Sequence, residues 1–147
     1  MIRIYLDYNG FQRGFDDPQH VRIQMEALAC QEIFNRAAHG EVELVWSFMH
    51  QDESLQCPFP DRQLEAFRLA SLCRVRIGPE EAIYNLAQSY IQQGAVSAKD
   101  AIHLACAIHT GAEVFLTWDD KLLKQAARLG LTMRVLNPVD FIRQRGE

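Results

Sequence analysis

Residues 2–7 read IRIYLD, a short apolar run that ends in a carboxylate. Runs of this length, rich in β-branched and aromatic residues, are typical of buried strands. The pattern returns at Val114–Thr117, which leads through Trp118 to Asp119. Open parallel sheets place their sites beyond the carboxyl ends of their strands. An acid after each of these runs therefore indicates a site at that edge of a sheet.

Strand and helix patterns alternate along the rest of the chain, which favours an α/β fold with a parallel central sheet. Further strands are predicted at Val42–Trp46, Arg74–Ile77 and Met133–Leu136. With 147 residues, 48% of them hydrophobic, the chain suits one compact domain over residues 1–147. We therefore expect a single α/β domain.

Polar caps and glycines mark the expected helix ends. Asp17-Pro18 has the form of an N-cap followed by proline at the first helical position, and this helix is expected to run to Ala38 before Gly40. Ser47, Asp61 and Ser97 are expected to cap helices. The other expected helices run from Ser47 to before Cys57, from Asp61 through Leu72, from Glu80 to Gln93 before Gly94, over Ala98–Thr110 and over Asp119–Leu129, with a last turn after Asn137.

The charge balance limits the kinds of partner. Lys and Arg number 15 against 19 Asp and Glu, a formal net charge of -4. A protein that binds nucleic acid by bulk charge is basic, so a polyanion has to be met by a local patch. The four cysteines have no zinc spacing and are expected to be thiols, mostly buried. Without a membrane-length apolar run or a signal-like start, we expect a soluble, cytoplasmic protein.

Four acids are candidate metal ligands, each next to a strand end or a helix start: Asp7, Glu53, Asp100 and Asp119. Carboxylates are hard ligands that suit Mg²⁺ or Mn²⁺, usually together with water and substrate phosphate. If the four converge, the pocket requires divalent cations, and this points to phosphodiester chemistry.

Each acid also has a structural explanation. Asp7 opens a stretch, DYNG, of ordinary turn formers. Asp100 is in a first helical turn, although Ser97 is the better N-cap. Of Asp119 and Asp120, one is expected to cap the next helix; we assign Asp119 to the metal and Asp120 a secondary role. Glu53 has the weakest pattern, because an acidic pair in mid-helix is typical of a solvated face.

Several other residues are expected near the acids. Asn9 and Thr117 are placed to bond a ligand carboxylate, and Thr117 also a phosphate. His103 follows Asp100 by one helical turn, where it either reaches the site or is a hydrogen-bonded core histidine. Cations close to the motifs are candidates for phosphate contacts: Arg13, Lys99, Lys121, Lys124 and Arg128. Ile23, Met25, Leu28 and Ile33 are suited to a core or a dimer face.

Taken in order, these motifs resemble the PIN-domain family, metal-dependent ribonucleases that include toxin components of bacterial toxin–antitoxin pairs. The resemblance covers essentially the whole chain. Its motifs are IYLD at 4–7, LVWS at 44–47 continuing to Glu53, AKDAIHLA at 98–105, FLTWD at 115–119 and the ending VLNPVDF at 135–141.

The resemblance implies a PIN-like three-layer α/β/α fold with sheet order 3-2-1-4-5. It implies a Mg²⁺- or Mn²⁺-dependent endoribonuclease in which Asp7, Glu53, Asp100 and Asp119 are catalytic, and it strengthens Glu53. An RNA substrate, an antitoxin partner and a homodimer are further implications. The stretch after Asp7 departs from many members, which carry a small residue or a hydroxyl there, and this affects the expected role of Asn9.

Two other functions remain open from the sequence. One is a catalytically inert PIN-like module that only binds RNA or protein, although all four acids are present. The other is a phosphoaspartate-type receiver domain with Asp7 as nucleophile. A receiver domain is disfavoured because position 9 is not an aspartate and Lys121 follows the acidic pair directly, without a strand-end lysine of its own.

Overall fold

The central sheet is parallel throughout and has five strands in the order β3-β2-β1-β4-β5. The computed structural model describes residues 1–12, 19–94 and 96–145. The strands are β1 (Ile2–Leu6), β2 (Val42–Ser47), β3 (Val75–Ile77), β4 (Val114–Leu116) and β5 (Arg134–Leu136). The predicted fold class and strand order are thus confirmed, and each predicted strand agrees with an observed one to within about a residue at either end.

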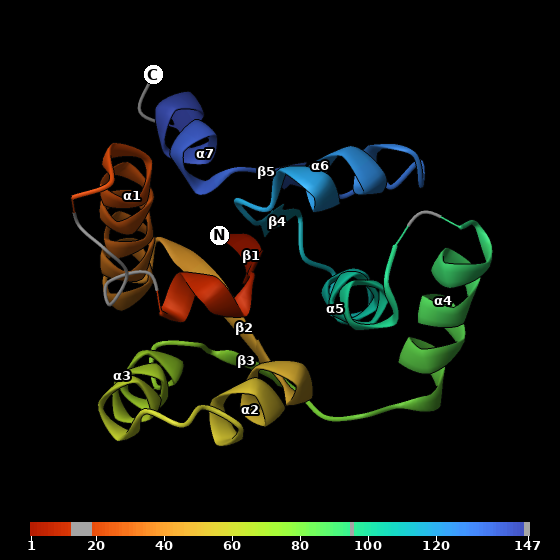
Figure 1. Ribbon diagram of the computed structural model, residues 1–147, viewed down its shortest axis with the longest axis horizontal. Coiled ribbons are helices and arrows are strands. Elements are labelled where there is room, and N and C mark those ends of the chain that lie inside the picture. Colours follow the sequence, from red (N-terminus) through yellow and green to blue (C-terminus); the bar gives the residue numbers. More distant parts are fainter. Residues whose placement is uncertain (13–18, 95, 146–147) are drawn as a thin grey trace.

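Helices cover both faces of the sheet (Figure 1). One face packs against α1, α3 and α7, and the other against α4, α5 and α6. The helices are η1 (Tyr8–Phe11, a 3-10 turn), α1 (Val21–Ala38), α2 (Phe48–Leu55), α3 (Pro60–Ala70), α4 (Glu81–Gln92), α5 (Ala98–His109), α6 (Asp120–Ala127) and α7 (Pro138–Arg145). This is the three-layer arrangement expected for a PIN-like fold.

β1 shows how the sequence produces these layers. Ile4 and Leu6 belong to the apolar core under α1 and α3, whereas Tyr5 belongs to the core under α5. Side chains alternate between the two faces of a strand, and a strand covered on both faces is apolar almost continuously. β1 therefore brings a polar tyrosine hydroxyl into the core on the α5 side.

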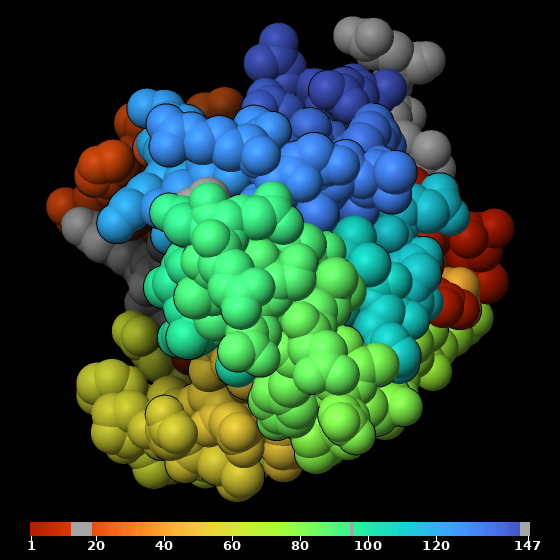
Figure 2. Space-filling view, turned by 90° about the vertical axis from the view of Figure 1, so that its right-hand side faces the viewer, coloured from red at the N-terminus to blue at the C-terminus, as the bar shows by residue number. Residues whose placement is uncertain are grey.

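α5 is the most deeply buried helix, as its composition predicts. Ala101, Leu104 and Ala105 are fully buried, and α4 packs over the outer side with Ile83, Ala87 and Tyr90, one face of an amphipathic helix. Figure 2 looks onto this side and shows α4 between α6 above and α2 below. α5 is thereby held firmly, which fixes the position of its polar residues.

Most predicted helix ends are confirmed by the observed caps. The Ser47 hydroxyl accepts from the amides of Met49 and His50, and the Ser97 hydroxyl accepts from the amide of Asp100. Gly40 and Gly94 follow α1 and α4 with φ of 75° and 77°, a conformation that glycine adopts without strain.

The predicted starts of two helices, α1 and α3, differ from the observed ones. Asp17 and Pro18 lie outside the described residues, and α1 begins only at Val21, because His20 has extended backbone angles and is the N-cap. The Asp61 cap was wrong: Phe59 is the N-cap of α3 and Pro60 takes the first position. Proline suits that position since its fixed φ is helical and its missing N–H would have had no helical partner.

No helix within the described ranges is both long and apolar enough to cross a membrane. The cysteines are thiols, and Cys30, Cys73 and Cys106 are buried as expected, while Cys57 is partly exposed. Burial raises the pKa of the Cys73 and Cys106 thiols to about 12. These side chains therefore act as packing groups and not as reactive thiolates.

Candidate active site at the strand ends

Asp7 lies at the carboxyl end of the central strand, and Thr117 holds its side chain. The Thr117 hydroxyl donates to Asp7 Oδ2 at 2.9 Å and accepts from the Asp119 amide at 3.1 Å. The Asp7 amide in turn donates to the Leu116 carbonyl at 2.9 Å. The predicted bond between Thr117 and a candidate ligand carboxylate is therefore present, and it ties the segments after β1 and β4 together.

The Asp7 carboxylate is only partly balanced. Burial raises its pKa, while the hydrogen bond from the Thr117 hydroxyl acts in the opposite direction. Glu53 lies close enough to raise the pKa of Asp7 further by repulsion, and the nearby backbone of Asn9 lowers it. Neither Thr117 nor the Asn9 backbone carries a charge. An ionised Asp7 in this position gains from a nearby cation.

Glu53 is not on a solvated face, contrary to the mid-helix pattern. Its side chain is 16% exposed and its Oε2 lies 3.6 Å from Lys99 Nζ. Its Oε1 lies 2.5 Å from His103 Nε2. Residues from α2 and α5 thus meet beside Asp7. Lys99, predicted as a phosphate contact, here pairs with a carboxylate.

Asp100 lies on the same helix, three residues before His103. Its amide donates to the Ser97 hydroxyl at 3.2 Å, so Ser97 is the cap and the Asp100 side chain is not used for capping. Residues three apart on a helix share a face, and Asp100 is partly buried there. The helix that presents His103 and Lys99 to Glu53 therefore also carries Asp100.

Asp119 and Asp120, which follow β4, have roles that differ from the prediction. Asp119 is the N-cap of α6, and its Oδ1 accepts from the amides of Lys121 and Leu122 at 3.0 and 3.3 Å. Asp120 forms a bidentate pair with Arg22, with both N–O distances 3.1 Å, and Arg22 holds the pKa of Asp120 below its usual range. The candidate ligand is thus also the cap, although the cap uses only one of its oxygens.

Among the described residues, no three His, Cys, Asp or Glu side chains are grouped closely enough to hold a metal ion. Asp7 and Glu53 are brought together, whereas Asp100 and Asp119 lie at the rim with their side chains partly or largely exposed. The four-ligand set stays a prediction, as does a secondary role for Asp120. Arg13 lies outside the described residues, and the exposed side chains of Lys121, Lys124 and Arg128 remain candidate phosphate contacts.

A histidine that the sequence pattern did not single out, His50, supports the backbone next to Asp7. It is fully buried, and its Nε2 donates to the Leu6 carbonyl at 2.8 Å. Its Nδ1 accepts from the Ser47 amide at 2.9 Å, completing a capping box. Because one nitrogen donates and the other accepts, the ring is neutral. Burial lowers the pKa of His50 to about 3.

The low pKa of His50 predicts a pH-dependent stability. Above pH 6.5 the ring is neutral in both folded and unfolded chains, so its contribution is constant. Between pH 6.5 and about pH 3, His50 is protonated in the unfolded chain but stays neutral in the folded protein. This group alone should lower the free energy of unfolding by about 1.4 kcal/mol per pH unit in that window.

Urea unfolding of the metal-free protein at several pH values between about 4 and 8 measures this slope. In His50→Gln, whose amide can still donate to the Leu6 carbonyl, the slope should be shallower than in wild type. The exposed His39→Gln should keep the wild-type slope. Equal slopes in wild type and His50→Gln would contradict a neutral buried ring.

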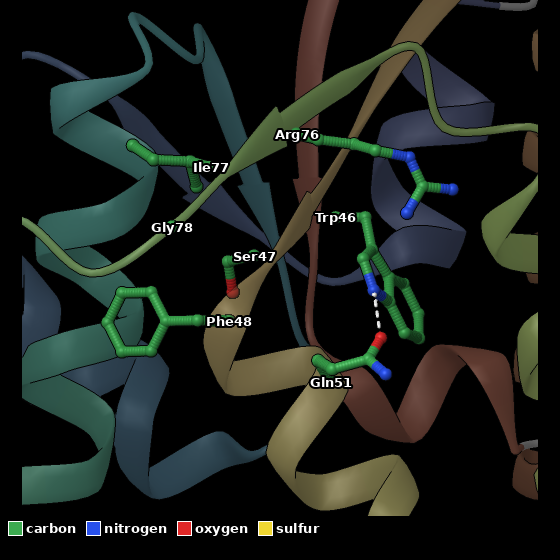
Figure 3. A pocket seen from close by; sticks show the side chains of 7 residues that line it. All are labelled: Trp46, Ser47, Phe48, Gln51, Arg76, Ile77 and Gly78. Atoms are coloured by element: carbon green, nitrogen blue, oxygen red, sulfur yellow. Dashed lines mark hydrogen bonds between the residues drawn. The ribbon is translucent and has the colours of Figure 1, made fainter.

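A pocket of about 300 Å³ lies at the same edge of the sheet, beside the ends of β2 and β3 (Figure 3). In its lining, Trp46 Nε1 donates to Gln51 Oε1 at 2.9 Å. The pocket is lined by Trp46, Ser47, Phe48, Gln51, Arg76, Ile77 and Gly78. Ser47 therefore lies between this pocket and the buried side chains behind Asp7.

The family model for the PIN domain matches residues 4–129, the range that holds all four acids. The chain belongs to the PIN-domain family. The resemblance inferred from the motifs is thereby confirmed, and a receiver domain is no longer a candidate. No curated protein sequence matches this PIN domain significantly.

Solved structures share the fold of this PIN domain. FitAcB from Neisseria gonorrhoeae is similar with a TM-score of 0.57 and 19% identity, over 92% of this chain and 97% of that one. PAE2754 from Pyrobaculum aerophilum is similar with a TM-score of 0.54 and 12% identity, over 99% of this chain and 97% of that one. At these identities the likeness describes the architecture alone.

Sequence reasoning missed part of the PIN-domain site. It placed His103 either at the site or in the core, and the residue does both, because its two ring nitrogens contact Glu53 and Tyr5. It missed Tyr5 and His50. A signal was available for His50, since Ser47 is followed three residues later by a side chain able to bond back to the cap. For Tyr5, the only available signal was a polar hydroxyl within an otherwise apolar strand.

Proposed function

We propose that the protein is a divalent-metal-dependent endoribonuclease that hydrolyses phosphodiester bonds in RNA. The observation that carries the proposal is the pair of like-charged carboxylates, Asp7 and Glu53, at the end of the central strand, where burial and their mutual repulsion raise the pKa of Asp7. Such a pair gains from a bound cation. Membership of the PIN family supports the reaction class, because PIN domains are generally nucleases.

The residues present fit Mg²⁺ or Mn²⁺, since the donors are carboxylate oxygens. Asp7, Glu53, Asp100 and Asp119 would hold the metal, with Asp120 secondary. Asp100 is only partly buried and Asp119 is exposed, so neither side chain is fixed in the core. Mg²⁺ keeps several waters, so the ligands that remain at the rim can act through water.

When bound, the metal lowers the pKa of a coordinated water and offsets charge on the phosphate. The chain's own groups hold the carboxylates: Thr117 bonds Asp7, and His103 and Lys99 contact Glu53. Lys99 is more than half exposed, so it can also turn to a phosphate. Unpaired RNA is the expected substrate, because a flexible strand can enter a narrow site.

The partners are proposed on the family resemblance alone. An antitoxin protein and a homodimer are expected if the protein is the toxin of a toxin–antitoxin pair. On α1, Ile33 is buried in the core, whereas Met25 and Leu28 are exposed. Ile33 is therefore a core residue, and only the exposed residues of this helix are available for a dimer face. A neighbouring reading frame for a small DNA-binding protein is the observation that decides the toxin question.

Removing the metal tests the proposed reaction directly. Purified protein with Mn²⁺ should cleave a single-stranded RNA internally, and EDTA should reduce cleavage to background, because the carboxylates alone do not activate water. Asp100→Asn should lower the rate by about 10²-fold, whereas Asp140→Asn, on the exposed face of α7, should not.

Calorimetric titration with Mn²⁺ separates the enzyme from an inert module. An enzyme of this kind binds Mn²⁺ tightly at a small number of sites, and Asp100→Asn weakens that binding. Cleavage that persists in EDTA would contradict metal-dependent hydrolysis. A folded protein that neither binds Mn²⁺ nor cuts RNA would identify a binding module.

A further inference from the structure

A chain of buried polar groups runs behind the acidic site, from the backbone beside Asp7 to the side chain of Glu53. Tyr5 and His50 are fully buried, and Ser47 and His103 nearly so, at 1% and 3% exposed. The links are His50 Nε2 to the Leu6 carbonyl at 2.8 Å, Ser47 Oγ to His50 Nδ1 at 3.1 Å, Ser47 Oγ to Tyr5 Oη at 2.8 Å, Tyr5 Oη to His103 Nδ1 at 2.6 Å, and His103 Nε2 to Glu53 Oε1 at 2.5 Å.

The cap of α2 sets the direction of these hydrogen bonds. The Ser47 oxygen accepts from the amides of Met49 and His50 at 3.2 and 3.4 Å, which uses both of its lone pairs. Ser47 therefore does not accept a proton from Tyr5, and its own single proton can be donated either to Tyr5 Oη or to His50 Nδ1. The Tyr5 O–H then donates to His103 Nδ1 at 2.6 Å, a much stronger acceptor than the sulfur of Cys106, which also lies near the hydroxyls of Ser47 and Tyr5.

The Tyr5 bond determines the protonation of His103. A ring nitrogen that accepts carries no proton, so the proton of the neutral imidazole lies on Nε2. That N–H points at Glu53 Oε1. The hydroxyl of Tyr5 thus acts through the ring of His103 to present a donor to the carboxylate.

Burial makes this arrangement rigid. Each member of a buried polar network is costly to leave unpaired, and ring contacts pack Tyr5 between Phe115 and His50, with His103 at its edge. A network that served only the core would be complete with partners in the core. This one ends at a partly exposed carboxylate beside Asp7.

We propose that Tyr5 and His103 are positioning residues that hold Glu53 in the orientation in which it serves the metal site. The inference rests on the proposed function, in which Glu53 is a metal-binding carboxylate. Hydrogen bonds that orient metal-binding side chains typically contribute 10- to 100-fold in metal affinity. Neither residue contacts the metal or the RNA in this proposal.

The first experiment needs no metal. Long-range ¹H–¹⁵N NMR spectra of the metal-free wild-type protein should show His103 protonated on Nε2 only. In Tyr5→Phe, which keeps the ring but removes the hydroxyl, the Nδ1 resonance should shift toward a mixture of protonation states. Tyr90→Phe, at another buried tyrosine on the same side of the sheet, should leave His103 unchanged. A wild-type His103 protonated on Nδ1 overturns the proposal, whether or not the protein is a nuclease.

The second experiment measures Mn²⁺ affinity by calorimetry. We expect Tyr5→Phe to bind Mn²⁺ about 10-fold more weakly, with Tyr90→Phe as wild type, and His103→Gln, whose amide can still donate to Glu53, to lose less than His103→Leu. RNA cleavage by Tyr5→Phe should recover at saturating Mn²⁺, which a general loss of folding would not allow. Wild-type affinity in both Tyr5→Phe and His103→Leu contradicts the positioning role, whereas absence of Mn²⁺ binding by the wild type contradicts the proposed function itself.

Discussion

Asp7→Asn is expected to abolish Mn²⁺-dependent RNA cleavage, with a rate loss on the order of 10³-fold, while the metal-free protein stays folded. The asparagine oxygen still accepts from the Thr117 hydroxyl, so the link between the β1 and β4 segments survives. The lost group is the negative charge at the end of the central strand, which no neighbouring side chain replaces.

The same variant should not lower the stability of the metal-free protein. Burial raises the pKa of Asp7, so the folded state disfavours the charged form, and its ionisation costs stability at pH values above the folded pKa. Removing the charge should therefore leave the melting temperature of the metal-free protein at pH 7 equal to or above that of wild type. Added Mn²⁺ should raise the melting temperature of wild type but not of the variant.

The exposed Asp61→Asn is a suitable control for Asp7→Asn, because it removes one negative charge from the first turn of α3. It should cleave RNA at the wild-type rate. Cleavage by Asp7→Asn within a few-fold of wild type would remove Asp7 from the metal site.

Glu53→Gln is expected to reduce cleavage by about 10²-fold or more, because a neutral amide is a poor ligand for Mg²⁺ or Mn²⁺. The glutamine oxygen can keep the hydrogen bond from His103 Nε2, so the α2–α5 contact is preserved. Lys99, 3.6 Å from the carboxylate, loses its partner. Rates and Mn²⁺ affinity should fall together, since the change acts on metal binding.

The adjacent Asp52 provides a matched control for Glu53. It belongs to the same acidic pair and the same helix, but its side chain is exposed. Asp52→Asn should therefore retain wild-type rates and Mn²⁺ affinity. A loss of equal size in both variants would show that the charge of α2, and not the contact between Glu53 and His103, is what the reaction needs.

Much of the fold follows from local sequence, as β1 and α5 show. The apolar run at Ile2–Leu6 and the almost wholly apolar 101–108 segment each allow one burial pattern, and Ser47 and Ser97 cap their helices as predicted. Asp61 misled because Pro60 precedes it and fixes the helix start. The start of α1 was also misplaced, since the extended backbone of His20 is not visible in a residue pattern.

The candidate site was predicted unevenly, for a physical reason. Asp7 and Thr117 follow neighbouring strands, and the sheet order brings them into contact. Glu53 depends on the packing of α2 against α5, a tertiary contact that mid-helix periodicity does not report, so only the family resemblance identified it. The sequence left open whether Asp119 or Asp120 caps α6, because aspartate is a favoured N-cap residue at either position.

The several contacts of Ser47 determine what must be copied if this acidic site is grafted onto another scaffold. Ser47 ends β2, caps α2, lines the pocket and is hydrogen-bonded to Tyr5. Copying the surface carboxylates alone would leave their supports behind. The smallest transferable unit comprises β1, the β2–α2 corner and α5, together with the turn after β4. A graft that omits the corner should therefore inherit the charges of the site without its geometry.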